Sequence, residues 1–201
     1  MKARLIIVFS ALLLTISSQC LYANDNPLIG EWVSTARTKG GLGGSKYFRD
    51  DGTVIVTFGA LIDFKYKITG NILRLYDDKG ELATEQEFKF SNSDLILKVL
   101  KTGEEQKMTR VQGDPLPNII GKWVGNHYTG GKQCMHFTKG LNCYFSVPFE
   151  QVKGNYKVTS NSYIEEFDGK NKTEWKISIK GDLLTLTNTD DGKIAEYRRR
   201  E

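Results

Sequence analysis

The stretch IGEWV at residues 29–33 decides the fold, because it returns further along the chain as IGKWV at residues 120–124. Two more segments return in the same order: YKITGN at 66–71 as YKVTSN at 156–161, and EFKFS at 87–91 as EWKIS at 174–178. The offset between copies stays between 87 and 91 residues. An ordered set of matches at a nearly constant offset indicates that a whole domain is duplicated.

Each copy is a series of short apolar runs separated by turn sequences such as Asp50-Asp51-Gly52 and Gly70-Asn71. The connections are too short for the crossover helix that parallel strands require, so the strands are predicted to be antiparallel. The runs of the first copy are Gly30–Thr35, Lys46–Arg49, Thr53–Phe58, Phe64–Thr69, Ile72–Tyr76, Thr84–Phe90, Leu95–Leu100 and Gln106–Val111.

Alternating side chains indicate strands with one buried and one solvated face. Phe64, Tyr66 and Ile68 share one face of their run, while lysines and a threonine occupy the other. Eight antiparallel strands in sequential hairpins leave two exposed edges, and closure into a barrel removes them. The predicted fold is therefore all-β, with two tandem eight-stranded antiparallel up-and-down barrels. An open two-sheet sandwich is the alternative.

The first 23 residues have the form of an export signal, with Lys2 and Arg4 before an apolar run and a cleavage position at Ala23. Cleavage after Ala23 is favoured over a lipid anchor at Cys20, because Gln19 suits a lipoprotein signal poorly. No later segment is long and apolar enough for a transmembrane helix. The expected organisation is a signal peptide (1–23), repeat 1 (24–112), a linker containing Pro115 and Pro117 (113–118) and repeat 2 (119–201).

The charge of the chain gives no reason to expect a nucleic-acid partner. The formal net charge falls from +4 to +2 when the signal is removed, because the signal holds two basic residues and no acidic one. The basic run Arg198–Arg200 is interpreted as a solvated strand end, with contact to an anionic surface as the alternative.

The ordered pattern resembles the bacterial exported lipocalin-like domains, within the broader group of calycin barrels, over nearly the whole mature chain. The matching residues are Gly30, Trp32, Phe48, Asp51–Val54, Tyr66, Asp94–Leu95 and Arg110 in repeat 1, and Gly121, Trp123, Phe137, Gly140, Tyr156, Asp182–Leu183 and Arg199 in repeat 2. In such domains the tryptophan closes one barrel end and a late arginine packs across its ring. The resemblance therefore implies that Trp32 pairs with Arg110 and that Trp123 pairs with Arg199, in a structural role.

Cys134 and Cys143 lie on either side of a turn at Thr138-Lys139-Gly140 in repeat 2. In an exported protein such a pair predicts a disulfide, provided that the hairpin register places the two residues opposite each other. Free thiols are one alternative. A metal site formed with His127 and His136 is another, but the spacing suits no tight ligand pair, and no metal is expected.

No group of residues has the arrangement of a catalytic site. Acidic pairs such as Asp77-Asp78 and Glu165-Glu166 are interpreted as turn residues, because adjacent side chains on a strand or turn point apart and cannot face each other across a cleft. The segment Gly40–Gly44 lacks the lysine and the following helix of a phosphate-binding loop, and is read as a flexible loop. We therefore expect neither an enzyme nor a cofactor.

The expected function is that of an exported, periplasmic or secreted, non-enzymatic binding or accessory protein. The family resemblance implies a small apolar ligand in a barrel, although no ligand-binding residue can be named. The alternative is a protein-interaction module, such as an inhibitor or an envelope-assembly factor, that contacts an envelope or extracellular protein and has filled barrels. Strands of about six residues favour shallow, filled barrels.

Overall fold

The computed structural model describes residues 26–201 except 116, 160 and 170. The expected signal peptide and Cys20 lie outside these residues, so their interpretation stays a prediction. Regular structure in the described residues consists entirely of strands, and no helix there is long and apolar enough to cross a membrane.

Fourteen strands form one continuous antiparallel sheet that closes on itself in a ring, which confirms the all-β antiparallel class. Every strand pairs with its neighbour in the chain, and β1 pairs with β14. The strands are β1 Gly30–Ser34, β2 Leu42–Phe48, β3 Thr53–Thr69, β4 Ile72–Tyr76, β5 Leu82–Ser91, β6 Asp94–Val99, β7 Glu105–Gly113, β8 Gly121–Asn126, β9 Lys132–Phe137, β10 Asn142–Val158, β11 Ser162–Phe167, β12 Asn171–Lys180, β13 Leu183–Asn188 and β14 Ile194–Arg200.

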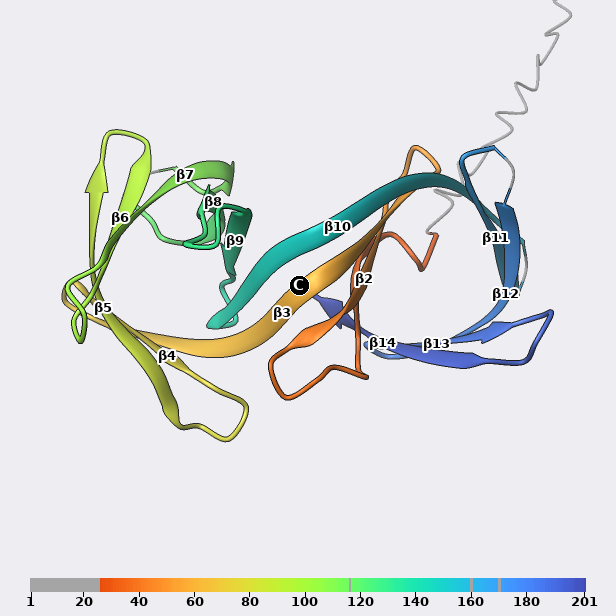
Figure 1. Cartoon of the computed structure of the whole chain (residues 1–201), viewed down its shortest axis with the longest axis horizontal. Coiled ribbons are helices and arrows are strands. Elements are labelled where there is room, and N and C mark those ends of the chain that lie inside the picture. Colours follow the sequence, from red (N-terminus) through yellow and green to blue (C-terminus); the bar gives the residue numbers. More distant parts are fainter. Residues whose placement is uncertain (1–25, 116, 160, 170) are drawn as a thin grey trace, which may run out of the picture.

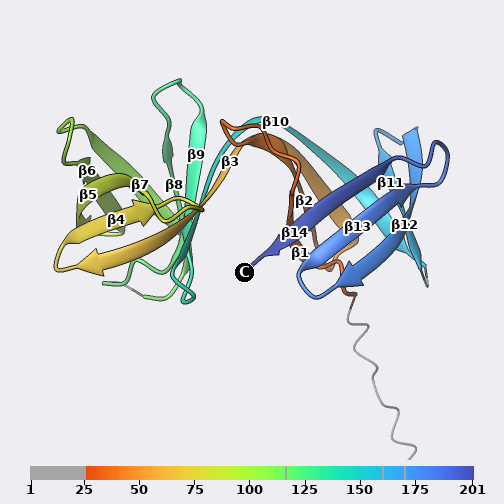
Figure 2. The same cartoon turned by 90° about the horizontal axis from the view of Figure 1, so that it is seen from below.

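Strands β3 and β10 are much longer than the others and pair with each other across the middle of the ring. This pairing divides the ring into two lobes, as Figures 1 and 2 show. Lobe A contains β4–β9 with the end of β3 and the start of β10. Lobe B contains β1, β2 and β11–β14 with the start of β3 and the end of β10.

The long strand β3 differs from the expectation of two runs, Thr53–Phe58 and Phe64–Thr69. Residues 59–63 continue the strand instead of turning, because they pair with β10 without interruption from Gly59 to Asp63. The two backbones approach closely at this crossing. A Cβ atom on Gly59 would collide with the carbonyl oxygen of Val147, so only glycine fits there.

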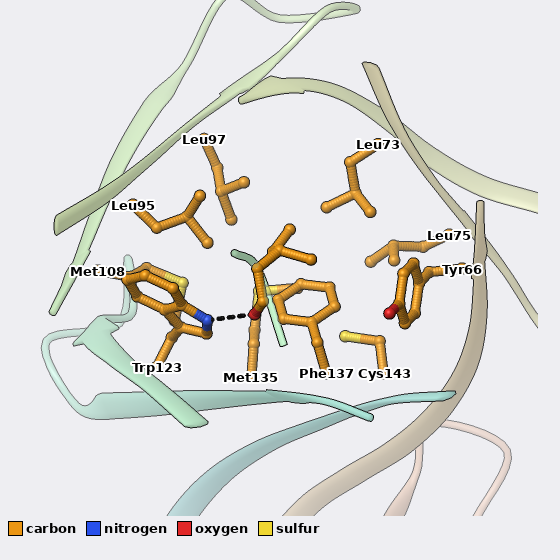
Figure 3. Close-up of a cluster of buried hydrophobic side chains, with 11 residues drawn as sticks. Tyr66, Leu73, Leu75, Leu95, Leu97, Met108, Trp123, Met135, Phe137 and Cys143 are labelled. Atoms are coloured by element: carbon orange, nitrogen blue, oxygen red, sulfur yellow. Dashed lines mark hydrogen bonds between the residues drawn. The ribbon is translucent and has the colours of Figure 1, made fainter. Parts of the chain in front are cut away.

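The packed lobes do not coincide with the sequence repeats. Figure 3 shows the core of lobe A, where Tyr66 and Leu73 of repeat 1 pack with Trp123 and Phe137 of repeat 2. The core of lobe B likewise combines residues of repeat 1, including Trp32, with residues of repeat 2. Each lobe is thus assembled from half of each repeat. The expected linker at 113–118 connects β7 to β8, which pair with each other inside lobe A.

Strand pairing also corrects the alignment of the two repeats after residue 84. Gln86 lies opposite Leu73, and Trp175 lies opposite the equivalent residue Tyr163. Gln86 therefore corresponds to Trp175, which the sequence matched to Phe88. The EFKF and EWKI segments look alike because both alternate charged and apolar residues, and a two-residue shift preserves that alternation.

The predicted disulfide between Cys134 and Cys143 is wrong, because both cysteines are free. Cys134 lies opposite Ser146 and Cys143 lies opposite Phe137, so the two cysteines are three positions out of register. An odd offset places their side chains on opposite faces of the sheet. Cys143 is buried in the core of lobe A, whereas Cys134 lies on the outer face.

We expect the unfolded, unreduced mature chain to accept an alkylating reagent at both Cys134 and Cys143, as measured by mass spectrometry of its peptides. In the native protein Cys143 should resist the reagent, because burial is complete and strongly raises the pKa of its thiol. A chain in which both cysteines react only after reduction would contradict this structure.

Candidate functional site

Each tryptophan of the repeated motif lies beneath an arginine, but the partners are exchanged relative to the expectation. The guanidinium carbon of Arg199 is 4.3 Å from the ring centroid of Trp32. Arg110 lies 4.4 Å above Trp123 in the same way. The predicted pairs Trp32–Arg110 and Trp123–Arg199 are therefore wrong, because each lobe takes its tryptophan and its arginine from different repeats.

Both tryptophans are fully buried and tied to the chain that precedes them. The indole nitrogen of Trp32 donates a hydrogen bond of 2.6 Å to the carbonyl of Leu28, and that of Trp123 donates one of 2.7 Å to Ile119 (Figure 3). Arg199 also donates to the carbonyls of Pro27 and Ile29. The two indole rings are fully covered and hold the ends of the lobes in place, which leaves them no surface for a ligand.

The buried cluster of lobe A contains no charged side chain, whereas lobe B contains a buried ion pair. The ammonium of Lys46 on β2 lies 2.5 Å from a carboxylate oxygen of Glu165 on β11, and both side chains are almost fully buried. The indole of Trp175 and the hydroxyl of Tyr163 also donate to this carboxylate, at 2.8 and 3.2 Å. Glu165 thus accepts three hydrogen bonds inside the lobe.

The sequence analysis missed this ion pair, although one signal was present. Successive side chains of a strand point to opposite faces, so Lys46 shares the inward face of β2 with Phe48 while Tyr47 points outward. An inward position is normally occupied by an apolar residue. The sequence pattern indicated only an acidic pair at a turn for Glu165, whereas this residue is buried on β11. A charged residue at an inward position was the sign that an opposite charge had to follow elsewhere in the chain.

Burial at this cluster shifts several pKa values. It lowers the pKa of Lys46, an effect that the charge of Glu165 opposes. Burial and then the same carboxylate raise the pKa of Tyr163, and they raise the pKa of Tyr197 to about 12. These tyrosines remain protonated at a pH where tyrosine in an unfolded chain has begun to ionise.

We expect the free energy of unfolding to fall as the pH rises above about 10. A group whose pKa is raised by folding contributes its full stabilisation at a pH below its pKa in the unfolded chain. This stabilisation is lost as the pH rises to its pKa in the folded protein. For Tyr197 this window runs from about 10 to about 12 and corresponds to ~2–3 kcal/mol. Urea unfolding at pH 8 and at pH 11 measures the fall, which should be smaller in Tyr197→Phe. An equal fall in that variant would contradict the assignment.

A hollow lined by Arg198–Glu201 and by residues of the crossing strands β3 and β10 lies between the lobes. Figure 2 shows the C-terminal end of the chain between the two lobes. This interlobe cleft has a volume of about 620 Å3 and is open to solvent. Its lining contains five cationic and three acidic side chains: Arg37, Lys65, Arg198, Arg199 and Arg200 against Asp63, Asp182 and Glu201. The cleft therefore carries an excess of positive charge.

Arg200 is the buried centre of the interlobe cleft. Its guanidinium lies 2.6 Å from a carboxylate oxygen of Asp63 and 3.3 Å from one of Glu31, and it covers the ring of Tyr144 at 4.9 Å. Burial alone would raise the pKa of Asp63, but Arg200 and Arg37 together lower it. These contacts anchor β14 to β3 and β10, so Arg200 has a structural role in the cleft.

Arg198 and Lys65 are cations of the cleft that make fewer contacts with the protein than Arg200 does. Among the residues that the structure describes, Arg198 forms an ion pair with Asp182, and both side chains are more than half exposed. Lys65 donates to the side chain of Asn142 at the surface. Ion pairs and hydrogen bonds at such exposed positions are weak, so both cations can exchange their present partners for an incoming anionic group.

The other candidate residues are not assembled into a site. Cys143 faces the core, Cys134 and His136 lie on the outer face of β9, and His127 contacts Thr129 in a loop. In the part of the chain that the structure describes, no group of three or more potential ligands could hold a metal. Asp51 and Asp77 accept hydrogen bonds from backbone amides of their own turns. Gly43 and Gly44 belong to β2.

The fold and its clefts define an all-β protein whose two filled lobes are joined by a crossed pair of strands. No protein-family model matches the chain, and no curated protein is similar to it in sequence.

Proposed function

We propose that the chain is an exported, non-enzymatic binding protein that uses the interlobe cleft to hold an acidic segment of a protein partner. The observation that supports this most directly is the placement of the hollows. The core clusters contain large side chains packed to zero exposure, whereas the cleft of about 620 Å3 lies between the lobes. That volume is in the range of about 300–1,000 Å3 that is typical of ligand sites.

The lipocalin-like resemblance is retained in this proposal in a modified form. Each lobe is bounded by eight strand segments when β3 and β10 are counted in both, and each has the Trp–Arg closure of the calycin pattern. We propose that each lobe is one lipocalin-like unit made from two half-repeats. A small apolar ligand inside a lobe is disfavoured, because Trp, Phe and Leu side chains already occupy the centre.

The charge of the cleft argues for an acidic partner. Arg198 and Lys65 approach the cleft from opposite lobes, and both are accessible. A chain carrying Asp or Glu side chains could contact both, and an attraction of this kind weakens as salt increases. An extended peptide is favoured over a compact ligand because the cleft is open to solvent at the junction of β3, β10 and β14.

An octaglutamate peptide labelled with a fluorophore tests the proposal by anisotropy titration at low and high NaCl. We expect saturable binding that weakens with salt and that falls about tenfold in the variant R198A/K65A, since two exposed ionic contacts contribute about 0.5–1 kcal/mol each. The matched control K89A/K98A removes two exposed lysines from β5 and β6 of lobe A and should bind normally.

A second titration uses N-phenyl-1-naphthylamine, a probe of apolar sites. We expect no saturable fluorescence increase with the folded protein. Saturable binding of this probe without binding of the acidic peptide would favour the small apolar ligand and would overturn the proposal. Equal loss of peptide binding in both double variants would show that net charge alone attracts the peptide, which would also overturn it.

A further inference from the structure

The contacts that close the two lobes are made by the same residue types in both. Tyr66 packs edge-on against Phe137 with its hydroxyl on the carbonyl of Thr138, and Tyr156 packs against Phe48 with its hydroxyl on the carbonyl of Arg49. The Trp–Arg pairs are also duplicated. Contacts between identical residues would form equally well if each repeat closed on itself.

For this comparison, each repeat has a front segment before the crossing (residues 30–58 and 121–148) and a rear segment after it (residues 64–113 and 153–200). In lobe B the front segment of repeat 1 packs with the rear segment of repeat 2. In lobe A the front segment of repeat 2 packs with the rear segment of repeat 1. The exchanged arrangement alone contains the pairing of residues 59–63 with 144–148. Among side-chain contacts, those that favour one arrangement must lie at positions at which the repeats differ.

The buried ion pair occupies such positions. Lys46 lies opposite Trp32, and the equivalent position opposite Trp123 is Met135. Glu165 lies opposite Tyr156, and the equivalent position opposite Tyr66 is Leu75. The exchanged arrangement therefore places Lys46 against Glu165 in lobe B, and Met135 in the same lobe as Leu75 in lobe A.

We infer that the Lys46–Glu165 ion pair selects the exchanged arrangement of the repeats over the self-closed one. In a self-closed repeat 1, the ammonium of Lys46 would face the apolar position of Leu75. In a self-closed repeat 2, the carboxylate of Glu165 would face Met135. Each arrangement buries both charged groups, but only the exchanged one pairs them, and an unpaired buried charge is strongly unfavourable.

The hydrogen-bond donors around Glu165 do not themselves distinguish the two arrangements. Tyr163 and Trp175 donate to Glu165, and they belong to the same rear segment, so they would accompany it into either arrangement. Their repeat 1 equivalents, Leu73 and Gln86, offer Lys46 no carboxylate. The cation therefore finds an anion only in the rear segment of repeat 2, and the pair acts as a specificity device within a duplicated fold.

The experiment uses the full mature chain with a protease site inserted in the connection between β7 and β8, at residues 114–118. After cleavage, the exchanged arrangement holds the two fragments together because each lobe contains parts of both. Self-closed repeats have separate cores and would come apart. Gel filtration in native buffer distinguishes the two outcomes, and we expect the cleaved unmodified protein to elute as one species.

The decisive variant is K46M/M135K, which moves the lysine to the equivalent position of repeat 2. The carboxylate of Glu165 then finds its partner within its own repeat, and we expect the cleaved fragments to separate. Adding L75E/E165L moves the carboxylate to repeat 1 as well. Lys46→Met, Met135→Lys, Leu75→Glu and Glu165→Leu together place the ion pair in lobe A, and we expect the fragments to stay together again.

A folded K46M/M135K protein whose fragments remain fully associated would overturn the inference. If that variant does not fold, K46M/E165L replaces it, because removing both charges leaves no buried charge unpaired. That variant should show a fraction of dissociating fragments, since the selection is gone. Complete association of its fragments, as in the unmodified protein, would likewise overturn the inference.

Discussion

Replacing Trp32 with alanine is expected to destabilise lobe B by about 3–5 kcal/mol, as for other large aromatic side chains removed from a packed core. Trp32 is fully buried, it donates a hydrogen bond to Leu28, and it supports the guanidinium of Arg199. The substitution removes all three interactions and leaves a cavity at the closed end of the lobe.

The location of this effect distinguishes the exchanged arrangement from one domain per repeat. Trp32 belongs to repeat 1, but it packs with Leu184 and Leu186 of repeat 2. Hydrogen exchange measured by mass spectrometry should therefore accelerate most in β11–β14. Strands β4–β7, which belong to repeat 1 but lie in lobe A, should be affected less.

The matched control for Trp32→Ala is Tyr47→Ala, an aromatic residue on the neighbouring strand β2 that is 43% exposed. Its removal should change the free energy of unfolding far less. Preferential acceleration of exchange in β4–β7 by Trp32→Ala would contradict the arrangement described here, because it would place Trp32 in the same core as the rear strands of its own repeat.

Replacing Lys46 with methionine is expected to cost about 3–5 kcal/mol, because it leaves the carboxylate of Glu165 buried without its cation. Glu165→Leu should cost a similar amount by leaving the ammonium unpaired. The double variant K46M/E165L should be much less destabilised than the sum of the two, because its residues resemble Met135 and Leu75, which already occupy these positions in lobe A.

Urea unfolding of the four proteins in this double-mutant cycle measures the coupling between the two residues. Exposed pairs do not show coupling of this size, so Arg198 and Asp182 provide the control cycle. Additive effects of Lys46→Met and Glu165→Leu would show that the two charges do not depend on each other, contrary to the contact in the structure.

Local features of the sequence were sufficient to determine the strand class and most strand positions. The alternation at Phe64, Tyr66 and Ile68 and turns such as Asp50-Asp51-Gly52 depend only on residues close in the chain, and these strands and turns are present. Trp32 and Trp123 are buried and each has an arginine over its ring, as the lipocalin-like resemblance implied, although each arginine belongs to the other repeat. The register of a hairpin was less accessible, because Cys134 and Cys143 of the β9–β10 hairpin lie three positions apart in the pairing and not opposite each other.

The partners of these hairpins were decided only by the tertiary structure. Two homologous front segments face two homologous rear segments, so the local pattern is satisfied whichever pair forms, and the Trp–Arg contacts were assigned to the wrong repeat. The pairing of the continuous strand through Gly59 with β10 and the contact between Lys46 and Glu165 join distant parts of the chain. Such choices depend on small free-energy differences between nearly equivalent long-range pairings, and hydrophobic alternation cannot distinguish these pairings because it is the same in both repeats.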